Sequence, residues 1–220
     1  MTTAIVMMST IIVDENSRLF KTGWLTGNEL RYQQYVRGIT KFAEMTQKYK
    51  YDTFLVDNSV PDDKFTPELK NIFQKFNIKY LYCPPDGANL GAVNKGAGIL
   101  QAWRQIKTLF KPYTYIIHFE PRQYIHSDFL ISRFHSNKGN YIKMRNRCGG
   151  METGFFSIES KALLRYINMS LPSHLIKHNI SLENDLYKHF IKHNDKLIKI
   201  PILGLYWYFS KRHPNFPAHI

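Results

Sequence analysis

Cysteine is scarce in this sequence: the 220 residues contain two, Cys83 and Cys148, and they form no CxxC pair. Neither a disulfide framework nor a zinc site is therefore indicated, and we expect a protein of the reducing cytoplasm. Long apolar runs are also missing. The most apolar run near the N-terminus, residues 4–13, has no basic region before it and is too short to cross a bilayer, so we interpret it as a buried strand.

Acidic residues are few relative to basic ones. The sequence has 17 Asp and Glu and 30 Lys and Arg, which gives a formal net charge of +13. Such an excess predicts attraction to phosphates, nucleic acid or an anionic membrane. The sequence lacks an arginine-rich run, an RNA-recognition aromatic pattern and zinc-finger spacing. We therefore expect no nucleic acid partner and no transmembrane segment, while a phosphate-bearing substrate and peripheral membrane contact both fit the charge.

Short apolar runs alternate with stretches of helical spacing, which predicts an α/β protein with a mostly parallel central sheet flanked by helices. We expect one domain over residues 1–220, because this length with 44% hydrophobic residues suffices for a single core. In a doubly wound sheet of this kind, ligands bind beyond the carboxyl ends of the strands. The predicted strands cover residues 4–9, 53–56, 78–82, 113–119 and 140–144, and the predicted helices cover 30–49, 94–110 and a segment capped by Ser181.

Two short polar segments lie where such ligands are expected. Asp57 follows the second strand, where its carboxylate can accept hydrogen bonds from a nucleobase or ribose; the alternative is an Asx-turn that ends the strand. The glycine-bearing segment 89–98 leads into a helix, where the helix N-terminus and Lys95 favour a phosphate; the alternative is tight helix–sheet packing. The segment has neither the Walker pattern nor the GxGxxG pattern. Neither segment alone specifies a function.

Together, the two segments resemble the family 2 inverting glycosyltransferases, in which a strand ends in D-N-x-S and is followed by two N-x-G motifs, the second at the head of a helix. The likeness covers roughly residues 4–130 and implies a GT-A fold, a nucleotide-diphosphate sugar donor, by default a UDP-sugar, and a glycan acceptor in polysaccharide synthesis. It also implies a nucleotide-sugar-binding half, residues 1–125, and an acceptor-binding half, residues 126–220. By the same resemblance, the residues near the nucleotide are Asp57, Asn58, Asn89, Gly91, Asn94 and Lys95.

The sequence departs from this family at the motif that holds the metal ion. The family has Asp-x-Asp after the strand that corresponds to residues 113–119, and this chain has Glu120-Pro121-Arg122. Glu120 is the one candidate ligand for Mn²⁺ or Mg²⁺, and it also suits the ribose. Arg122 replaces the second carboxylate with a guanidinium that can neutralise a diphosphate through paired hydrogen bonds. We therefore hypothesise that no metal cofactor is required; the alternative is a Glu–Arg pair that closes a surface turn.

Two downstream segments resemble the sugar-binding and catalytic parts of the same family. Glu152, Thr153 and Gly154 fall in the segment beneath the donor sugar and acceptor, for which a flexible turn is the alternative. Glu183 falls on the position of the catalytic base, which removes the acceptor hydroxyl proton, and Asp185 is the second choice. Both are acidic residues in a first helical turn, where the helix dipole alone also favours them.

The C-terminal segment places aromatic residues before Lys211 and Arg212, which suits a lid that contacts the diphosphate, or equally a solvated tail. His189 and His193 are spaced for one helix face, but no third metal ligand accompanies them.

Two other functions fit the same alternation of strands and helices. A nucleotidyltransferase would carry a glycine-rich loop with Arg and Lys after the first strand, and residues 8–11 have none. A catalytically inactive nucleotide-sugar-binding domain would explain the missing Asp-x-Asp motif.

Overall fold

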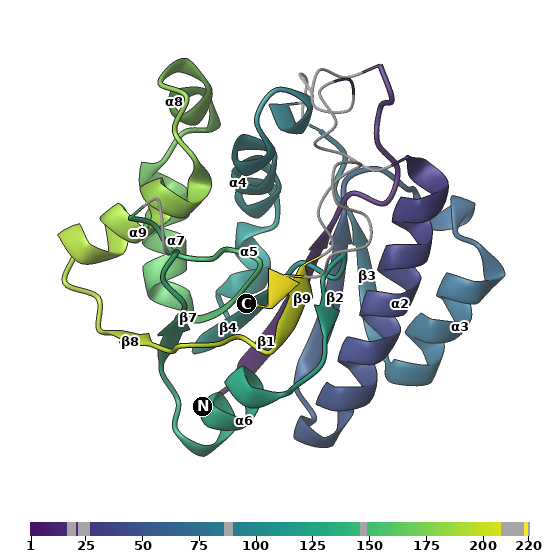
Figure 1. Cartoon of the computed structure of the whole chain (residues 1–220), viewed down its shortest axis with the longest axis horizontal. Coiled ribbons are helices and arrows are strands. Elements are labelled where there is room, and N and C mark those ends of the chain that lie inside the picture. Colours follow the sequence, from purple (N-terminus) through teal and green to yellow (C-terminus); the bar gives the residue numbers. More distant parts are fainter. Residues whose placement is uncertain (17–20, 22–26, 86–89, 146–148, 208–217, 220) are drawn as a thin grey trace.

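A five-stranded sheet forms the centre of the molecule (Figure 1). The computed structural model describes residues 1–16, 21, 27–85, 90–145, 149–207 and 218–219. The strand order is β3-β2-β1-β4-β7, and all neighbours are parallel except β4 and β7, which are antiparallel. The strands are β1 (Thr3–Ser9), β2 (Asp52–Asp57), β3 (Ile78–Tyr82), β4 (Tyr115–Phe119) and β7 (Phe155–Glu159).

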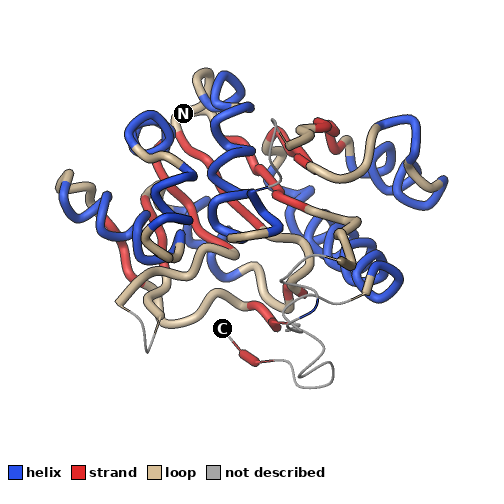
Figure 2. Tube along the Cα trace, turned by 90° about the horizontal axis from the view of Figure 1, so that it is seen from above, coloured by secondary structure: helices blue, strands red, loops and turns tan. Residues whose placement is uncertain are grey.

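Helices cover both faces of this sheet, as Figure 2 shows from above. Alternate residues of β1 enter two separate cores: Ile5 and Met7 pack with α2, α3 and α6, whereas Val6 and Met8 pack with α4, α7 and α9. The helices are α2 (Asn28–Thr46), α3 (Pro67–Phe76), α4 (Lys95–Gln105), α5 (Lys107–Phe110), α6 (Phe129–Ser136), α7 (Ser160–Met169), α8 (Pro172–Lys177) and α9 (Leu182–Lys192).

Two small sheets and three short 3-10 turns complete the described structure. β5 (Tyr124–Ile125), β9 (Leu205–Trp207) and β10 (Ala218–His219) form an antiparallel sheet, and β6 (Asn140–Ile142) pairs in parallel with β8 (Leu197–Lys199). The 3-10 turns are Gln47–Tyr49, Asp62–Lys64 and Leu90–Ala92. Within the described residues, no helix combines the length and apolar character that a membrane span requires.

Side-chain caps start three of the helices. The side chains of Thr66, Asn94 and Ser181 accept hydrogen bonds from backbone N–H groups in the first turns of α3, α4 and α9. Pro67 also occupies the first turn of α3, where its missing N–H costs nothing. The sequence predicted the cap at Ser181 but not helix α3.

The predicted α/β class with a mostly parallel sheet is confirmed, with corrections at some boundaries. The predicted helix 94–110 divides at Ile106, where φ is −94° and ψ is 10°, and the predicted helix 30–49 becomes a 3-10 turn after Thr46. The predicted strand 140–144 ends at Ile142, and Met144 forms an isolated bridge to Met151. Helices α3, α6, α7 and α8 were not predicted from the sequence.

The chain order of the strands creates a switch point between β1 and β4. From β1 the chain proceeds through β2 and β3 to one edge, and then returns to place β4 on the other side of β1. At such a point the two connections leave in opposite directions, so a crevice opens beyond the carboxyl ends of the two strands. Ser9 ends β1 and Glu120 follows β4, so both residues border this crevice.

Candidate functional site

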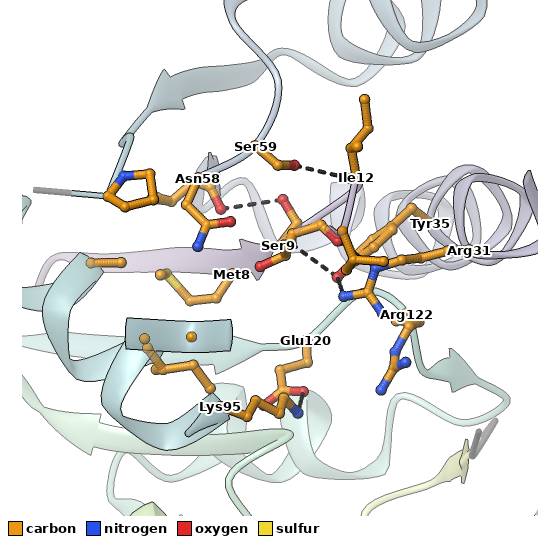
Figure 3. Close-up of a pocket in the computed structure, with 18 of the residues that line it drawn as sticks. Met8, Ser9, Ile12, Arg31, Tyr35, Asn58, Ser59, Lys95, Glu120 and Arg122 are labelled. Carbon is orange, nitrogen blue, oxygen red and sulfur yellow. Dashed lines mark hydrogen bonds and ion pairs between the residues drawn. The ribbon is translucent and has the colours of Figure 1, made fainter. Parts of the chain in front are cut away.

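A cavity lies at the switch point, and Figure 3 shows the side chains that line it. Its walls come from the end of β1 and the following loop, α2, the end of β2, α4 and the turn after β4. The apolar part includes Met8, Val56 and Ile99, and the charged part includes Lys95 and Glu120. Of the residues predicted to bind the donor, the cavity brings together Asn58, Gly91, Lys95, Glu120 and Arg122.

Asp57 holds the loops that border the cavity. One carboxylate oxygen accepts hydrogen bonds from the backbone N–H groups of Ser59 and Val60, at 2.7 and 2.8 Å, and from the Ser59 hydroxyl at 2.7 Å. The other accepts from the Ser9 hydroxyl at 2.6 Å and the Ile11 N–H at 3.0 Å. Both oxygens are thus engaged by protein donors, as in an Asx-turn. Contact between Asp57 and a nucleobase stays a prediction.

Asn58 faces the cavity directly. Its side-chain Oδ1 is buried and has no hydrogen-bond partner among the described residues. An unpaired buried amide oxygen costs free energy unless a ligand or water supplies a donor. Asn58 is therefore better placed than Asp57 to contact a ligand.

The glycines of the second motif allow close packing around the N-terminus of α4. A Cβ atom at Gly98 would lie 2.6 Å from the Gly91 Cα, and one at Gly96 would lie 2.6 Å from the Leu182 Cβ. Asn94 caps α4 by accepting from the Ala97 N–H at 3.0 Å. These contacts correspond to the packing alternative for this motif, although Gly91 and Lys95 also line the cavity. Asn89 lies outside the described residues.

Glu120 forms an ion pair with Lys95 across 25 residues of sequence. The Lys95 Nζ donates to Glu120 Oε2 at 2.5 Å, while Glu120 Oε1 is buried without a partner in the described part of the chain. Burial opposes ionisation of Glu120, but the charge and hydrogen bond of Lys95, with a smaller contribution from Arg122, outweigh it and lower the pKa of this carboxyl. Glu120 is therefore an ionised group in a cationic setting.

His118 lies in β4 two residues before Glu120 and is 1% exposed. Its ring stacks on Phe156 with ring centroids 4.9 Å apart. Burial lowers the pKa of His118 to about 4, opposed by Glu120 and assisted by Lys95, so the ring is neutral at pH 7. A neutral imidazole adds no charge to the cavity.

Arg122 and Arg31 both line the cavity (Figure 3). Burial and, to a smaller extent, repulsion from Arg31 together lower the pKa of Arg122 to about 10, against smaller opposing contributions from Tyr35 and Glu120. Arg31 is 5% exposed and was missed by the sequence analysis. A signal existed: Arg31 precedes Tyr35, Gly38 and Phe42 on the buried face of α2, where a charged residue is out of place.

Gly38 explains how α2 approaches the Glu120-Pro121-Arg122 turn so closely. A Cβ atom at Gly38 would lie 1.7 Å from the Pro121 carbonyl oxygen and 2.9 Å from that of Gln123. Only a residue without a side chain fits this contact. Gly38 thus sets the distance between the element that carries Arg31 and the turn that carries Arg122.

The predicted sugar-binding and catalytic residues meet at Arg145. This guanidinium lies 3.8 Å from a carboxylate oxygen of Glu152 and 3.5 Å from one of Glu183. Burial raises the pKa of Glu152; Arg145 opposes this, and the nearby charges of Glu183 and Glu120 add to it. Among the described residues, those that line the cavity include neither Glu152 nor Glu183.

The remaining predicted residues differ in their surroundings. Asp185 accepts a hydrogen bond from the Tyr166 hydroxyl at 2.8 Å, which ties it to α7. Thr153 is buried, and Gly154 packs on Gln123, whose side-chain nitrogen would lie 1.8 Å from an added Cβ. Lys211 and Arg212 lie outside the described residues.

A doubly wound sheet with a charged cavity at its switch point is typical of nucleotide-binding α/β proteins. Among solved structures, the chain is similar to a putative nucleotide-diphospho-sugar transferase from Desulfovibrio desulfuricans G20, with a TM-score of 0.56 and 10% identity over 91% of this chain and 80% of that chain. The chain therefore has the nucleotide-diphospho-sugar transferase fold, as predicted.

Two weaker likenesses accompany this one. A cytidylyltransferase from Leptospira borgpetersenii serovar Hardjo-bovis (strain JB197) gives a TM-score of 0.49 at 10% identity, over all of this chain and 82% of that chain. The PaToxG glycosyltransferase gives 0.48 at 10% identity, over 87% of this chain and 69% of that chain. No protein-family model matches the sequence, and no curated protein is detectably similar to it.

Proposed function

We propose that the protein transfers a glycosyl group from a nucleotide-diphosphate sugar, with a UDP-sugar as the first choice, to a glycan acceptor with inversion. One observation carries this proposal: the cavity at the switch point gathers Asn58, Lys95 and the Glu120-Pro121-Arg122 turn, which come from three separate motifs. The fold supports the proposal because ligands of doubly wound sheets bind at this position.

Each wall of the cavity suits one part of such a donor. Met8, Val56 and Ile99 offer apolar surface to a nucleobase, and Asn58 offers its unpaired amide. Glu120 suits the ribose hydroxyls. The cationic end, with Lys95 and Arg122, suits the diphosphate. The donor sugar would then extend towards Glu152, Thr153 and Gly154.

Glu183 is the proposed general base. Its carboxylate accepts the acceptor hydroxyl proton as that oxygen attacks the anomeric carbon, and the bond from that carbon to the diphosphate oxygen breaks with its electron pair. The leaving group is the nucleoside diphosphate. Arg145 lies 3.5 Å from the Glu183 carboxylate and holds it in place.

The fold family implies a divalent cation on the diphosphate, and the residues of this site do not fit one. Lys95 occupies one oxygen of Glu120, and Arg122 stands where a second carboxylate would bind the cation. Among the described residues, no group of three or more His, Cys, Asp or Glu side chains is arranged to hold a metal ion. We therefore propose that transfer proceeds without a metal cofactor.

The test is an assay of purified protein with a panel of UDP-, GDP- and dTDP-sugars, in EDTA and with added Mn²⁺ or Mg²⁺. We expect release of the nucleoside diphosphate from one donor, at a rate that EDTA lowers less than about twofold. Complete loss of activity that only a divalent cation restores would contradict the metal-independent proposal.

The same panel separates the other two functions. Binding of a donor, measured by thermal shift, without any turnover on the panel would indicate an inactive binding domain. Release of pyrophosphate from a nucleoside triphosphate in the presence of a sugar phosphate would instead indicate a nucleotidyltransferase.

A further inference from the structure

Two arginines from different elements lie at the same end of the cavity. Arg31 comes from the first turns of α2, and Arg122 comes from the turn after β4 (Figure 3). The Nη1 atoms of both side chains are buried and have no hydrogen-bond partner in the part of the chain that the structure describes. Each guanidinium therefore keeps at least one donor that the fold itself does not use.

The protein holds Arg31 in a fixed orientation. Its Nε donates to the Thr10 carbonyl oxygen at 2.5 Å, and its Nη2 donates to the Tyr35 hydroxyl at 3.2 Å. The Thr10 N–H in turn donates to the same hydroxyl at 3.0 Å. These bonds fix two of the three guanidinium nitrogens and leave the third, Nη1, free for a ligand.

Two like charges, one on the buried Arg31 and one on the half-buried Arg122, are unfavourable at one end of a cavity without an anion. Removing a charged group from water costs several kcal/mol unless a partner compensates it, and the repulsion between Arg31 and Arg122 adds to this cost. The carboxylate on the same turn, Glu120, compensates the charge of Arg122 only in part, because its Oε2 atom is also bonded to Lys95. Asp14 also lines the cavity but lies on its exposed rim.

We propose that Arg31 and Arg122 form a clamp that binds the diphosphate of the donor through their free guanidinium donors, in the place that a divalent cation takes in related folds. The identity of the ligand as a nucleoside diphosphate rests on the proposed function, whereas affinity for a diphosphate group does not. Guanidinium forks suit this ligand because their planar donors match pairs of phosphate oxygens.

If the clamp is correct, removing one arginine should weaken the binding of a diphosphate without lowering the stability of the protein. Arg122→Met removes one of the two repelling charges and keeps most of the side-chain volume. We expect the ligand-free variant to have a melting temperature equal to or higher than that of the wild type, because function and not folding requires this charge. A residue with a purely structural role would show the opposite, a lower melting temperature.

The experiment measures binding of inorganic pyrophosphate, UDP and uridine in EDTA by calorimetry and thermal shift. For Arg122→Met we expect pyrophosphate and UDP to bind at least about tenfold more weakly, the loss of one charge-assisted contact, and uridine to bind as before. Arg31→Met should weaken pyrophosphate similarly. The matched control is Arg104→Lys, since Arg104 lies on α4 and donates to the carbonyls of Ile167 and Ser170 outside the cavity.

The clamp is wrong if Arg122→Met binds pyrophosphate within twofold of the wild type. Arg31→Met also loses the bonds to Thr10 and Tyr35, so if that variant does not fold, Arg122→Met alone decides. A different result would contradict the proposed function: pyrophosphate binding would depend on the two arginines, but the protein would turn over no nucleotide sugar. Turnover with unchanged pyrophosphate binding in Arg122→Met would reject the clamp and keep the transferase.

Discussion

At the scale of single residues, the site depends on pairs of charges that are far apart in the sequence. Lys95 and Glu120 are each identifiable from a motif, but their contact is not, because nothing local relates the start of α4 to the end of β4. Arg31 belongs to no motif at all. Sequence patterns thus pointed to several of these charged groups, and only the fold shows which of them lie together.

Lys95→Met tests the first pair through its effect on stability. The variant leaves a carboxylate that is 9% exposed without its cation, whereas Lys95 itself is 54% exposed, so we expect a loss of about 1–3 kcal/mol in the free energy of unfolding at pH 7. Because pairing lowers the pKa of Glu120, this contribution is complete above the unfolded value of about 4.3 and disappears as the pH falls through the lower folded pKa.

Urea unfolding of wild type and Lys95→Met at pH 7 and pH 3 measures this difference. Lys161→Met is the matched control, because the ion pair of Lys161 with Glu159 lies at the surface, where water and salt screen it and it contributes little to stability. A gap between wild type and Lys95→Met that is as large at pH 3 as at pH 7 would contradict the assignment.

Glu183→Gln tests the proposed base. Loss of a general base lowers turnover about 10²–10⁴-fold, and the substitution keeps the shape of the side chain. We expect kcat to fall by this factor while the Kd for UDP changes little. Asp185→Asn is the control, because the bond of Asp185 to Tyr166 gives it a structural role. Near-normal turnover in Glu183→Gln, with a loss in Asp185→Asn, would transfer the role to Asp185.

At the scale of elements, local signals identified some individual helices and strands but not the partners of the strands. The cap at Ser181 placed α9 correctly, whereas β7 follows a segment that fits a flexible turn equally well in sequence. The antiparallel pairing of β7 with β4 depends on contacts between residues some 40 positions apart in the chain. The start of α3 at Thr66 and Pro67 has a local signal, but the strand signals on either side of it are stronger. The packing of α2 on the Glu120-Pro121-Arg122 turn is equally non-local.

Gly38→Ala tests that packing. The added methyl group would meet the Pro121 carbonyl oxygen, so α2 must move away from the turn, at a cost of about 1–3 kcal/mol in unfolding free energy. The movement also separates Arg31 from Arg122, so pyrophosphate should bind more weakly.

Chemical denaturation and calorimetry of the same sample measure both effects of Gly38→Ala. The control is Gly27→Ala, because a Cβ atom there would meet nothing closer than 3.8 Å. If Gly38→Ala were as stable as Gly27→Ala, the close approach of helix and turn would not be a constraint.

At the scale of the whole molecule, the strand order accounts for the position of the site. The predicted alternation of strands and helices located the chemistry beyond the carboxyl ends of the strands, and the cavity lies there. Composition did not specify which strands flank it. The order β3-β2-β1-β4 brings the loop after β1 opposite the turn after β4, and so unites residues from α2 with residues near the middle of the chain.

The guanidinium groups of the clamp have one further consequence, for the end of the catalytic cycle. A metal ion can leave together with the spent nucleotide and so take its neutralising charge away, but Arg31 and Arg122 are covalently part of the chain. Each turnover under the proposed mechanism therefore ends with a nucleoside diphosphate, more negative than the donor, still facing two fixed cations. Release of this product, and not the sugar transfer itself, would then be the rate-limiting step. Added salt would raise the turnover rate, because it screens the attraction between the product and the two arginines.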